Sequence, residues 1–315
     1  MNLYVDSEFP IRGLSKRPHE LVPFPTFFGI NCDPYVQDWK QHFERRKELM
    51  SKHAGFFLVA VSSLTKDLTN FHRVVPEQSF HEQYTGKFHF NFYKVGGVLT
   101  RVEIDDRLPV DSEDSLLYAQ AVGDSFWYPL LEKAYAKFRG TYEIIEYGLP
   151  IESFFHLTRK KSEFFDNGLN TSLPYNAQGM YSKLRELVNG KRLLICKLND
   201  PRDNNQQYGS GFIIVDVVEK KRMSNDGICE PCCFVKLRHP RGTIERGLAD
   251  SMGISEIDSS GEGLLDLERF VQQMQCVYFV DTSLHELPLN PGLDGFLPFV
   301  PVKPDSPANR HRCRQ

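Results

Sequence analysis

No stretch of this 315-residue sequence approaches the roughly 18 consecutive apolar residues that a membrane-spanning helix needs. The first ten residues, Met1 to Pro10, also contain no apolar core of the length found in a secretory signal peptide. We therefore expect a soluble, cytoplasmic protein without a transmembrane segment.

The number and spacing of the cysteines do not indicate disulfide bonds. Seven are spread through the chain, an odd number that does not suggest a disulfide framework and that fits a reducing compartment. The one cluster, Cys229-Glu230-Pro231-Cys232-Cys233, has no second Cys-x-x-Cys or His-x-x-x-His pair to complete the four ligands of a structural zinc site. Cys232 and Cys233 are therefore predicted to be strand residues that point to opposite faces, and we expect no metal there.

The chain carries no strong charge of either sign. Its net charge is −3, which excludes the basic excess that usually marks a nucleic-acid-binding domain. Basic clusters at residues 45–47, 159–161 and 220–222 are interpreted as solvated faces. With 41% hydrophobic and 25% charged residues, the composition is that of a globular protein with one substantial core or two modest ones.

The hydrophobic pattern changes character along the chain. Residues 56–64 are almost wholly apolar or small, and periodicity alone does not assign them to a helix or a strand. Asp124 or Ser125 is predicted to cap a helix that Gly140 ends, and Gly96-Gly97 indicates a hairpin turn. Helices are predicted over Val36–Leu49, Ser125–Phe138, Ala177–Val188 and Leu265–Met274. Strands are predicted over Gly86–Tyr93, Val98–Ile104, Arg192–Leu198, Gly211–Val218, Cys232–Leu237 and Gln275–Val280.

Several segments resemble the protease core of the calpains. The most specific are Asp105-Asp106-Arg107-Leu108-Pro109 and Leu130-Leu131-Glu132-Lys133-Ala134-Tyr135-Ala136-Lys137, and the resemblance extends over about Arg17 to Thr282. It implies an α+β, papain-like fold with a helix-rich first lobe and an antiparallel, β-rich second lobe. We divide the chain into an extended N-terminal segment with the first helix of the core (1–50), core subdomain 1 (51–147), core subdomain 2 (148–287) and a proline-rich, basic tail (288–315).

The same resemblance identifies the positions of the catalytic groups, and none holds the residue that the family uses. Gly55 stands where calpains have the nucleophilic cysteine, Ser210 where they have the general-base histidine, and His239 where they have the orienting asparagine. Leu49 takes the place of the glutamine that helps to form the oxyanion hole. Glycine cannot form an acyl intermediate, serine is no substitute for imidazole near neutral pH, and leucine donates no hydrogen bond. No functional catalytic residue is expected.

The calcium sites of the calpain core are expected to be degraded as well. Arg46 replaces an aspartate of the first site, and a cation is no ligand for calcium. Glu132 of that site and Glu262 in Ser260-Gly261-Glu262 are candidate remnants. We expect no cofactor and no calcium activation, while calcium binding by these remnants stays open.

Three functions remain open on these grounds. The leading one is a catalytically inactive protease homologue that binds proteins as a scaffold or regulator, with extended peptide segments as candidate occupants of the former cleft. A second is a calpain-type, calcium-dependent endopeptidase homologue with residual activity or with chemistry rebuilt on Ser210 and His239. A third is a cytoskeletal or membrane-peripheral adaptor that uses the basic clusters and the basic tail residues 309–314.

Overall fold

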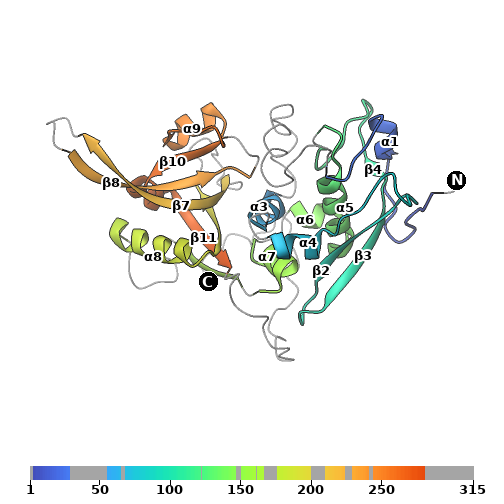
Figure 1. Ribbon diagram of the computed structural model, residues 1–315, viewed down its shortest axis with the longest axis horizontal. Coiled ribbons are helices and arrows are strands. Elements are labelled where there is room, and N and C mark those ends of the chain that lie inside the picture. Colours follow the sequence, from blue (N-terminus) through green and yellow to red (C-terminus); the bar gives the residue numbers. More distant parts are fainter. Residues whose placement is uncertain are drawn as a thin grey trace, which may run out of the picture.

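The computed structural model describes residues 3–28, 55–64, 68–121, 123–146, 150–160, 162–166, 176–199, 210–223, 229–240 and 244–280. The predicted helix over Val36–Leu49 and the tail 288–315 lie outside these residues. Figure 1 shows helices in the centre, a β-hairpin on one side and a large sheet on the other. None of the described helices combines the length and the apolar character that crossing a membrane requires.

The helices and strands follow one another in a mixed α+β order. The helices are α1 (Pro18–Leu21), α3 (Gly55–Leu64), α4 (Leu68–Val74), α5 (Trp127–Arg139), α6 (Tyr142–Glu146), α7 (Pro150–Thr158), α8 (Ala177–Asn189), α9 (Arg246–Met252) and α10 (Leu267–Gln273). The strands are β1 (Ser15–Lys16), β2 (Lys87–Tyr93), β3 (Leu99–Asp105), β4 (Leu108–Pro109), β5 (Ser162–Asp166), β6 (Leu193–Leu198), β7 (Ser210–Met223), β8 (Cys229–Arg238), β9 (Ile254–Ser255), β10 (Glu262–Asp266) and β11 (Met274–Val280).

The predicted hairpin forms between β2 and β3, in antiparallel register from Lys87 opposite Asp105 to Tyr93 opposite Leu99. Gly96 and Gly97 in its turn have φ of +88° and +75°, a conformation that glycine adopts without steric cost. The alternate residues Phe88, Phe90 and Phe92 are buried, as the two-residue repeat of a strand requires.

Helix α5 confirms the prediction for residues 125–138, although its predicted cap is wrong. The N-cap residue is Phe126, and no side chain caps the helix. Instead, the Ser125 hydroxyl donates a hydrogen bond to the Phe27 carbonyl at 3.0 Å, so a long-range contact with the N-terminal segment displaces the local one. Gly140 ends the helix as predicted, with φ of +113°.

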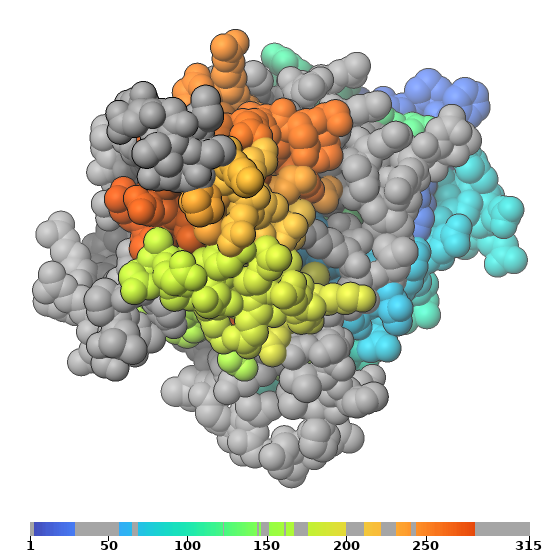
Figure 2. Space-filling view, turned by 60° about the vertical axis from the view of Figure 1, so that its left-hand side comes forward, coloured from blue at the N-terminus to red at the C-terminus, as the bar shows by residue number. Residues whose placement is uncertain are grey.

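The seven-stranded sheet is antiparallel throughout, in the order β5-β11-β6-β7-β8-β10-β9. Side chains alternate between its two faces: Leu193, Ile195 and Ile213 join the core around α3 and α7, whereas Leu194 and Phe212 join a second core. Helix α8, in the range predicted from the sequence, closes that second core with Met180, Leu184 and Leu187. Figure 2 shows α8 lying across the outside of this part of the molecule.

The prediction for the last helix starts too early. Leu265 and Asp266 belong to β10, where they pair with Val235 and Phe234 of β8. The helix α10 begins only at Leu267, and the Asp266 carboxylate caps it by accepting hydrogen bonds from the backbone N–H groups of Glu268 and Arg269. An apolar run that crosses from a strand into a helix hides this boundary from periodicity.

The subdomain boundary at residues 147 and 148 stays a prediction. Helix α7 follows that boundary in the sequence, yet its Phe154 and Leu157 belong to the same core as α3 and α5. We call β1–β4 with α1 and α3–α7 the first lobe, and the seven-stranded sheet with α8–α10 the second lobe.

Candidate functional site

Helix α3 lies at the junction of the two lobes and begins at Gly55, the position expected to correspond to a nucleophile. It contacts α4, α6 and α7 on one side and strands β6 and β7 on the other. Every residue from Phe57 to Leu64 is buried. A helix that is apolar all round is the kind that a core surrounds, which explains why this segment shows no polar face.

One stripe of α3 faces the strand ends that carry the other two predicted positions. Positions 55, 59 and 62 share this stripe because residues four and seven apart lie on the same face of a helix. Val59 Cγ2 lies 3.1 Å from the point that a Cβ of residue 211 would occupy, at the start of β7. The Ser62 hydroxyl donates a hydrogen bond to the Pro240 carbonyl at 3.3 Å, just beyond the end of β8. The fold therefore gathers the regions of Gly55, Ser210 and His239 at one place.

Ser210 and His239 stand at neighbouring strand ends without being opposite each other. Ser210 is the first residue of β7, and β8 ends at Arg238, which pairs with Ile213. Continuing that register brings His239 opposite Phe212, and the two rings contact each other edge to face with centroids 5.4 Å apart. The His239 side chain is half-buried. The fourth predicted position, Leu49, lies outside the described residues.

Three of the described cysteines are poor candidates for a substitute nucleophile. Cys196 and Cys276 are buried in β6 and β11, and burial raises the pKa of both thiols. Cys232 and Cys233 are residues of β8, as predicted, and burial likewise raises the pKa of Cys233. A thiol with a raised pKa is a poor nucleophile because the thiolate is the reactive form.

Glu132 of α5 is a buried carboxyl group, and no ion pair joins it to a cationic side chain among the described residues. Its side chain accepts a hydrogen bond from the Ala119 backbone N–H at 2.6 Å. Burial raises its pKa to about 7, so the group is partly protonated at neutral pH. In the described parts of the chain, no three His, Cys, Asp or Glu residues gather as metal ligands, so Glu132 does not fit a calcium site by itself.

Replacing Glu132 with glutamine is expected to stabilise the protein at alkaline pH. A carboxyl pKa raised from about 4.3 to about 7 means that the native state binds the proton more tightly, so stability falls as pH rises through that window. Glu132→Gln removes this titration. Near pH 8 the free energy of unfolding of Glu132→Gln should therefore be about 1–3 kcal/mol higher than that of the unsubstituted protein. Below about pH 5 the two proteins should differ little.

Urea unfolding at the two pH values measures this difference. Glu186→Gln, at an exposed position of α8, is the matched control and should change the free energy of unfolding by no more than about 0.5 kcal/mol. An equal effect of Glu132→Gln at both pH values would show that Glu132 does not titrate in this window.

Glu262, the second candidate calcium remnant, is already paired with a cation. The Lys236 ammonium lies 2.8 Å from Glu262 Oε2 and 3.1 Å from Asp258 Oδ2. An ammonium group between two carboxylates occupies the position that a metal ion bridging them would need. These residues therefore do not fit a calcium site as they stand.

The structure shows a second polar cluster that sequence reasoning missed. Its centre is Asp105 at the end of β3, which is 1% exposed and pairs with the fully buried Lys133 of α5 and with Arg107. Lys133 also donates hydrogen bonds to the carbonyls of Asp105 and Arg107, at 2.9 and 2.6 Å. Burial alone would raise the pKa of the Asp105 carboxyl group. The Lys133 ammonium and the hydrogen bonds that the Asp105 carboxylate accepts outweigh burial and hold this pKa below its usual value.

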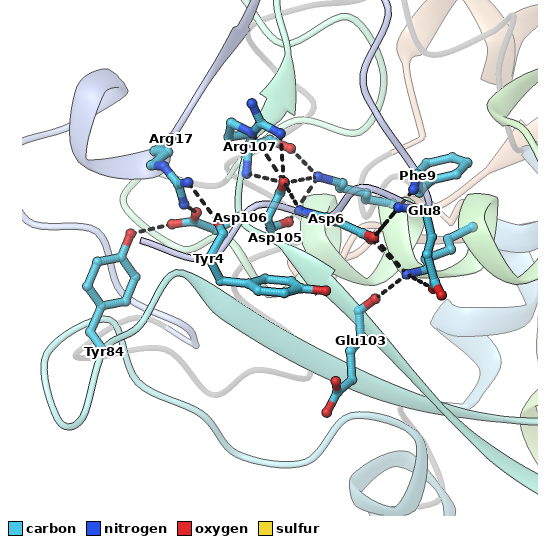
Figure 3. Close-up of polar contacts among 12 residues, drawn as sticks. Tyr4, Asp6, Glu8, Phe9, Arg17, Tyr84, Glu103, Asp105, Asp106 and Arg107 are labelled. Carbon is cyan, nitrogen blue, oxygen red and sulfur yellow. Dashed lines mark hydrogen bonds and ion pairs between the residues drawn. The ribbon is translucent and has the colours of Figure 1, made fainter. Parts of the chain in front are cut away.

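This cluster fastens the N-terminal segment to the end of β3 and to α5, as Figure 3 shows. The Asp6 backbone N–H donates to Asp105 Oδ2 at 2.8 Å, and the Lys137 ammonium lies 2.8 Å from Asp6 Oδ2. Arg17 pairs with Asp106 and donates to the Tyr4 carbonyl at 2.8 Å. The signal was present in the two most specific sequence motifs, which supply Asp105, Asp106, Arg107, Lys133 and Lys137. Those motifs are structural in this chain.

Comparison with known proteins identifies related sequences. A sequence profile described as "Calpain family cysteine protease" matches residues 15–247. The chain is 31% identical to human calpain-8 over 73% of its own length and 31% of the relative's, and 34% identical to mouse calpain-8 over 80% and 34%. It is 33% identical to the rat calpain-1 catalytic subunit over 73% and 30%. The chain thus spans about a third of the length of these curated relatives.

Proposed function

Since this chain belongs to the calpain family of cysteine proteases, we propose that it is a member without proteolytic activity, which binds other proteins in the cytoplasm as a scaffold or regulator. The observation that carries the proposal is that α3 begins with a glycine, at the position that the resemblance assigns to the nucleophile. Val59 and Ser62, on the same stripe of α3, lie near the start of β7 and the end of β8, which supports a former active site there that lacks its reactive group.

Three further features support the proposal. The base position holds Ser210, whose hydroxyl does not accept a proton near neutral pH as an imidazole does. The orienting position holds His239, whose ring packs against Phe212. The described carboxylates Glu132 and Glu262 do not fit calcium, as argued above. Losses in several independent parts of one mechanism are hard to reconcile with retained catalysis.

The purified protein is expected not to cleave unfolded casein in the presence of calcium, and Gly55→Cys is expected not to restore cleavage. A thiol at position 55 would still have no imidazole at the base position, which holds Ser210, and would lack the family's oxyanion donor. Loss of a catalytic triad lowers kcat by about 10⁶-fold in a well-studied protease, so both proteins should stay below detection. Cleavage by Gly55→Cys would show that the remaining positions still form a working site.

Binding at the former active site is tested with a bulky substitution. Gly55→Trp should abolish the capture of partner proteins by the immobilised chain if the partners enter the cleft as extended segments. Thr69→Trp, at an exposed position of the neighbouring helix α4, is the matched control and should leave capture unchanged. Capture that persists in Gly55→Trp, in a protein whose circular dichroism matches the unsubstituted chain, would place the partner surface elsewhere.

A hydrolase rebuilt on Ser210 and His239 is the second candidate function. Their positions at adjacent strand ends favour it, since β7 and β8 pair along most of their length. The contact of the His239 ring with Phe212 weighs against it, because a general base has to face its nucleophile. Covalent labelling of Ser210 by a fluorophosphonate, lost in Ser210→Ala, would establish this function, and no labelling would dispose of it.

A further inference from the structure

Residues 256–262, which connect β9 to β10 and include the first residue of β10, form an acidic loop whose three carboxylates each have a lysine partner. Glu256 pairs with Lys220 of β7, and both Asp258 and Glu262 pair with Lys236 of β8. Two lysines thus face three carboxylates, so most of the negative charge of this loop is compensated from within the chain.

Asp258 organises the backbone of the acidic loop. Its Oδ1 accepts hydrogen bonds from the backbone N–H groups of Ser260 at 2.8 Å and Glu262 at 3.1 Å, and from the Ser260 hydroxyl. The Asp258 backbone N–H donates to the Glu262 carbonyl at 2.8 Å, and the Gly261 N–H donates to the Asp258 carbonyl at 2.9 Å. The other oxygen, Oδ2, remains directed at the Lys236 ammonium. One carboxylate thus fixes the turn with one oxygen and binds a cation with the other.

The Lys236 ammonium stands between two carboxylates that are four residues apart in the loop. Side chains in this arrangement are typical oxygen ligands for a divalent cation, and repulsion between the two carboxylates would open the loop if no cation lay between them. Lys236 is 28% exposed and Glu262 is 14% exposed, so solvent screens this contact less than it screens an ion pair in open water.

We propose that Lys236 is a built-in counter-cation of the acidic loop, which closes the loop without metal and prevents a calcium ion from binding between Asp258 and Glu262. The Lys236 ammonium belongs to the same chain and has a fixed local concentration near the two carboxylates. A calcium ion would have to enter from solution and compete with the ammonium for the position between Asp258 and Glu262. The loop is therefore closed at every calcium concentration. The proposal is independent of whether the chain cleaves peptides, since it concerns the order of the loop alone.

Lys236→Met tests the proposal by opening the position to metal. The thermal midpoint of the unsubstituted protein should be the same in EDTA and in millimolar calcium. In EDTA, Lys236→Met should lower the midpoint by about 2–4 °C, the shift typical of losing one such contact in a protein of this size. Calcium should restore it, with a dissociation constant on the order of 10⁻³ M, as expected for a site with few ligands.

Lys183→Met is the matched control, because Lys183 pairs with a single exposed carboxylate, Glu186, on α8. It should neither lower the midpoint appreciably nor create a calcium response. A calcium-induced rise in the unsubstituted protein as large as that in Lys236→Met would overturn the proposal. So would a Lys236→Met protein whose midpoint does not respond to calcium.

Hydrogen exchange in the unsubstituted protein gives a second test, which stands even if Lys236→Met fails to fold. The backbone N–H groups of Ser260 and Glu262 should be protected equally in EDTA and in calcium, because their acceptor on Asp258 is in place in both. Protection that rises tenfold or more on adding calcium would show that the metal, and not Lys236, closes the loop. Neither measurement depends on proteolysis or on partner binding. A failure of the proposal about Lys236 is therefore distinguishable from a failure of the proposed function.

Discussion

Replacing Lys133 with methionine is expected to lower the free energy of unfolding by about 3–5 kcal/mol, the usual cost of removing one partner from a buried ion pair. The side chains of Lys133 and Asp105 are 0% and 1% exposed, so water cannot replace the lost ammonium. Two backbone carbonyls, of Asp105 and Arg107, lose a donor at the same time. Equilibrium unfolding in urea measures the change.

The control for Lys133→Met is Lys183→Met, which removes an exposed helical ion pair and should cost no more than about 1 kcal/mol. The pH dependence supplies a second check. Because the pKa of Asp105 is held low in the native state, its ionised form adds stability that is present above about pH 4 and lost on further acidification. The difference in the free energy of unfolding between the unsubstituted protein and Lys133→Met should therefore become smaller at acidic pH. A loss below about 1 kcal/mol at neutral pH would contradict the buried-pair interpretation.

Phe57→Ala is expected to cost about 3–5 kcal/mol, because it removes a buried ring from the junction between α3 and α5. Phe57 is 1% exposed and stacks on Tyr135 with centroids 4.0 Å apart and planes 6° from parallel. The Tyr135 hydroxyl in turn contacts His156 Nδ1 at 2.8 Å. Burial lowers the pKa of His156 to about 3, so this contact involves a neutral imidazole at neutral pH.

Phe164→Ala on strand β5 is the matched control for Phe57→Ala, since its ring is 48% exposed and should cost about 1 kcal/mol or less. Both proteins can be compared by urea unfolding followed by tyrosine and tryptophan fluorescence. Similar losses for the two substitutions would mean that the α3 to α5 contact is not a principal support of the first lobe. A selective loss at Phe57 would identify it as the residue that holds the start of α3 in place.

Sequence patterns predicted those elements whose apolar residues recur with a clear period. Helices α5 and α8 and the β2–β3 hairpin are of this kind, and their predicted bounds agree with the structure within about two residues. Helix α3 has no polar face because both lobes enclose it. Its apolar sequence alone therefore did not distinguish a helix from a strand.

Long-range contacts set the limit of what could be predicted. Ser125 bonds to a carbonyl 98 residues away and not to its own helix, and Asp6 contacts Asp105 across 99 residues. Neither of these two hydrogen bonds produces a pattern in the sequence around its residues. Likewise, the pairing of Lys236 with Asp258 and Glu262 depends on the register of β8 with β10, which the sequence alone does not specify. The candidate catalytic positions could be named from motifs, whereas their convergence around one stripe of α3 required the fold.

The order of strands in the seven-stranded sheet also has a kinetic consequence. Strand β11 is the last of the described strands along the chain, yet it lies inside the sheet, between β5 and β6. Its residues Met274–Val280 pair with partners synthesised about a hundred residues earlier. Such non-local pairing slows folding, and until it forms, β5 and β6 each present an unpaired edge. A nascent chain that has reached only residue 247, where the family match ends, therefore still has a gap inside its sheet.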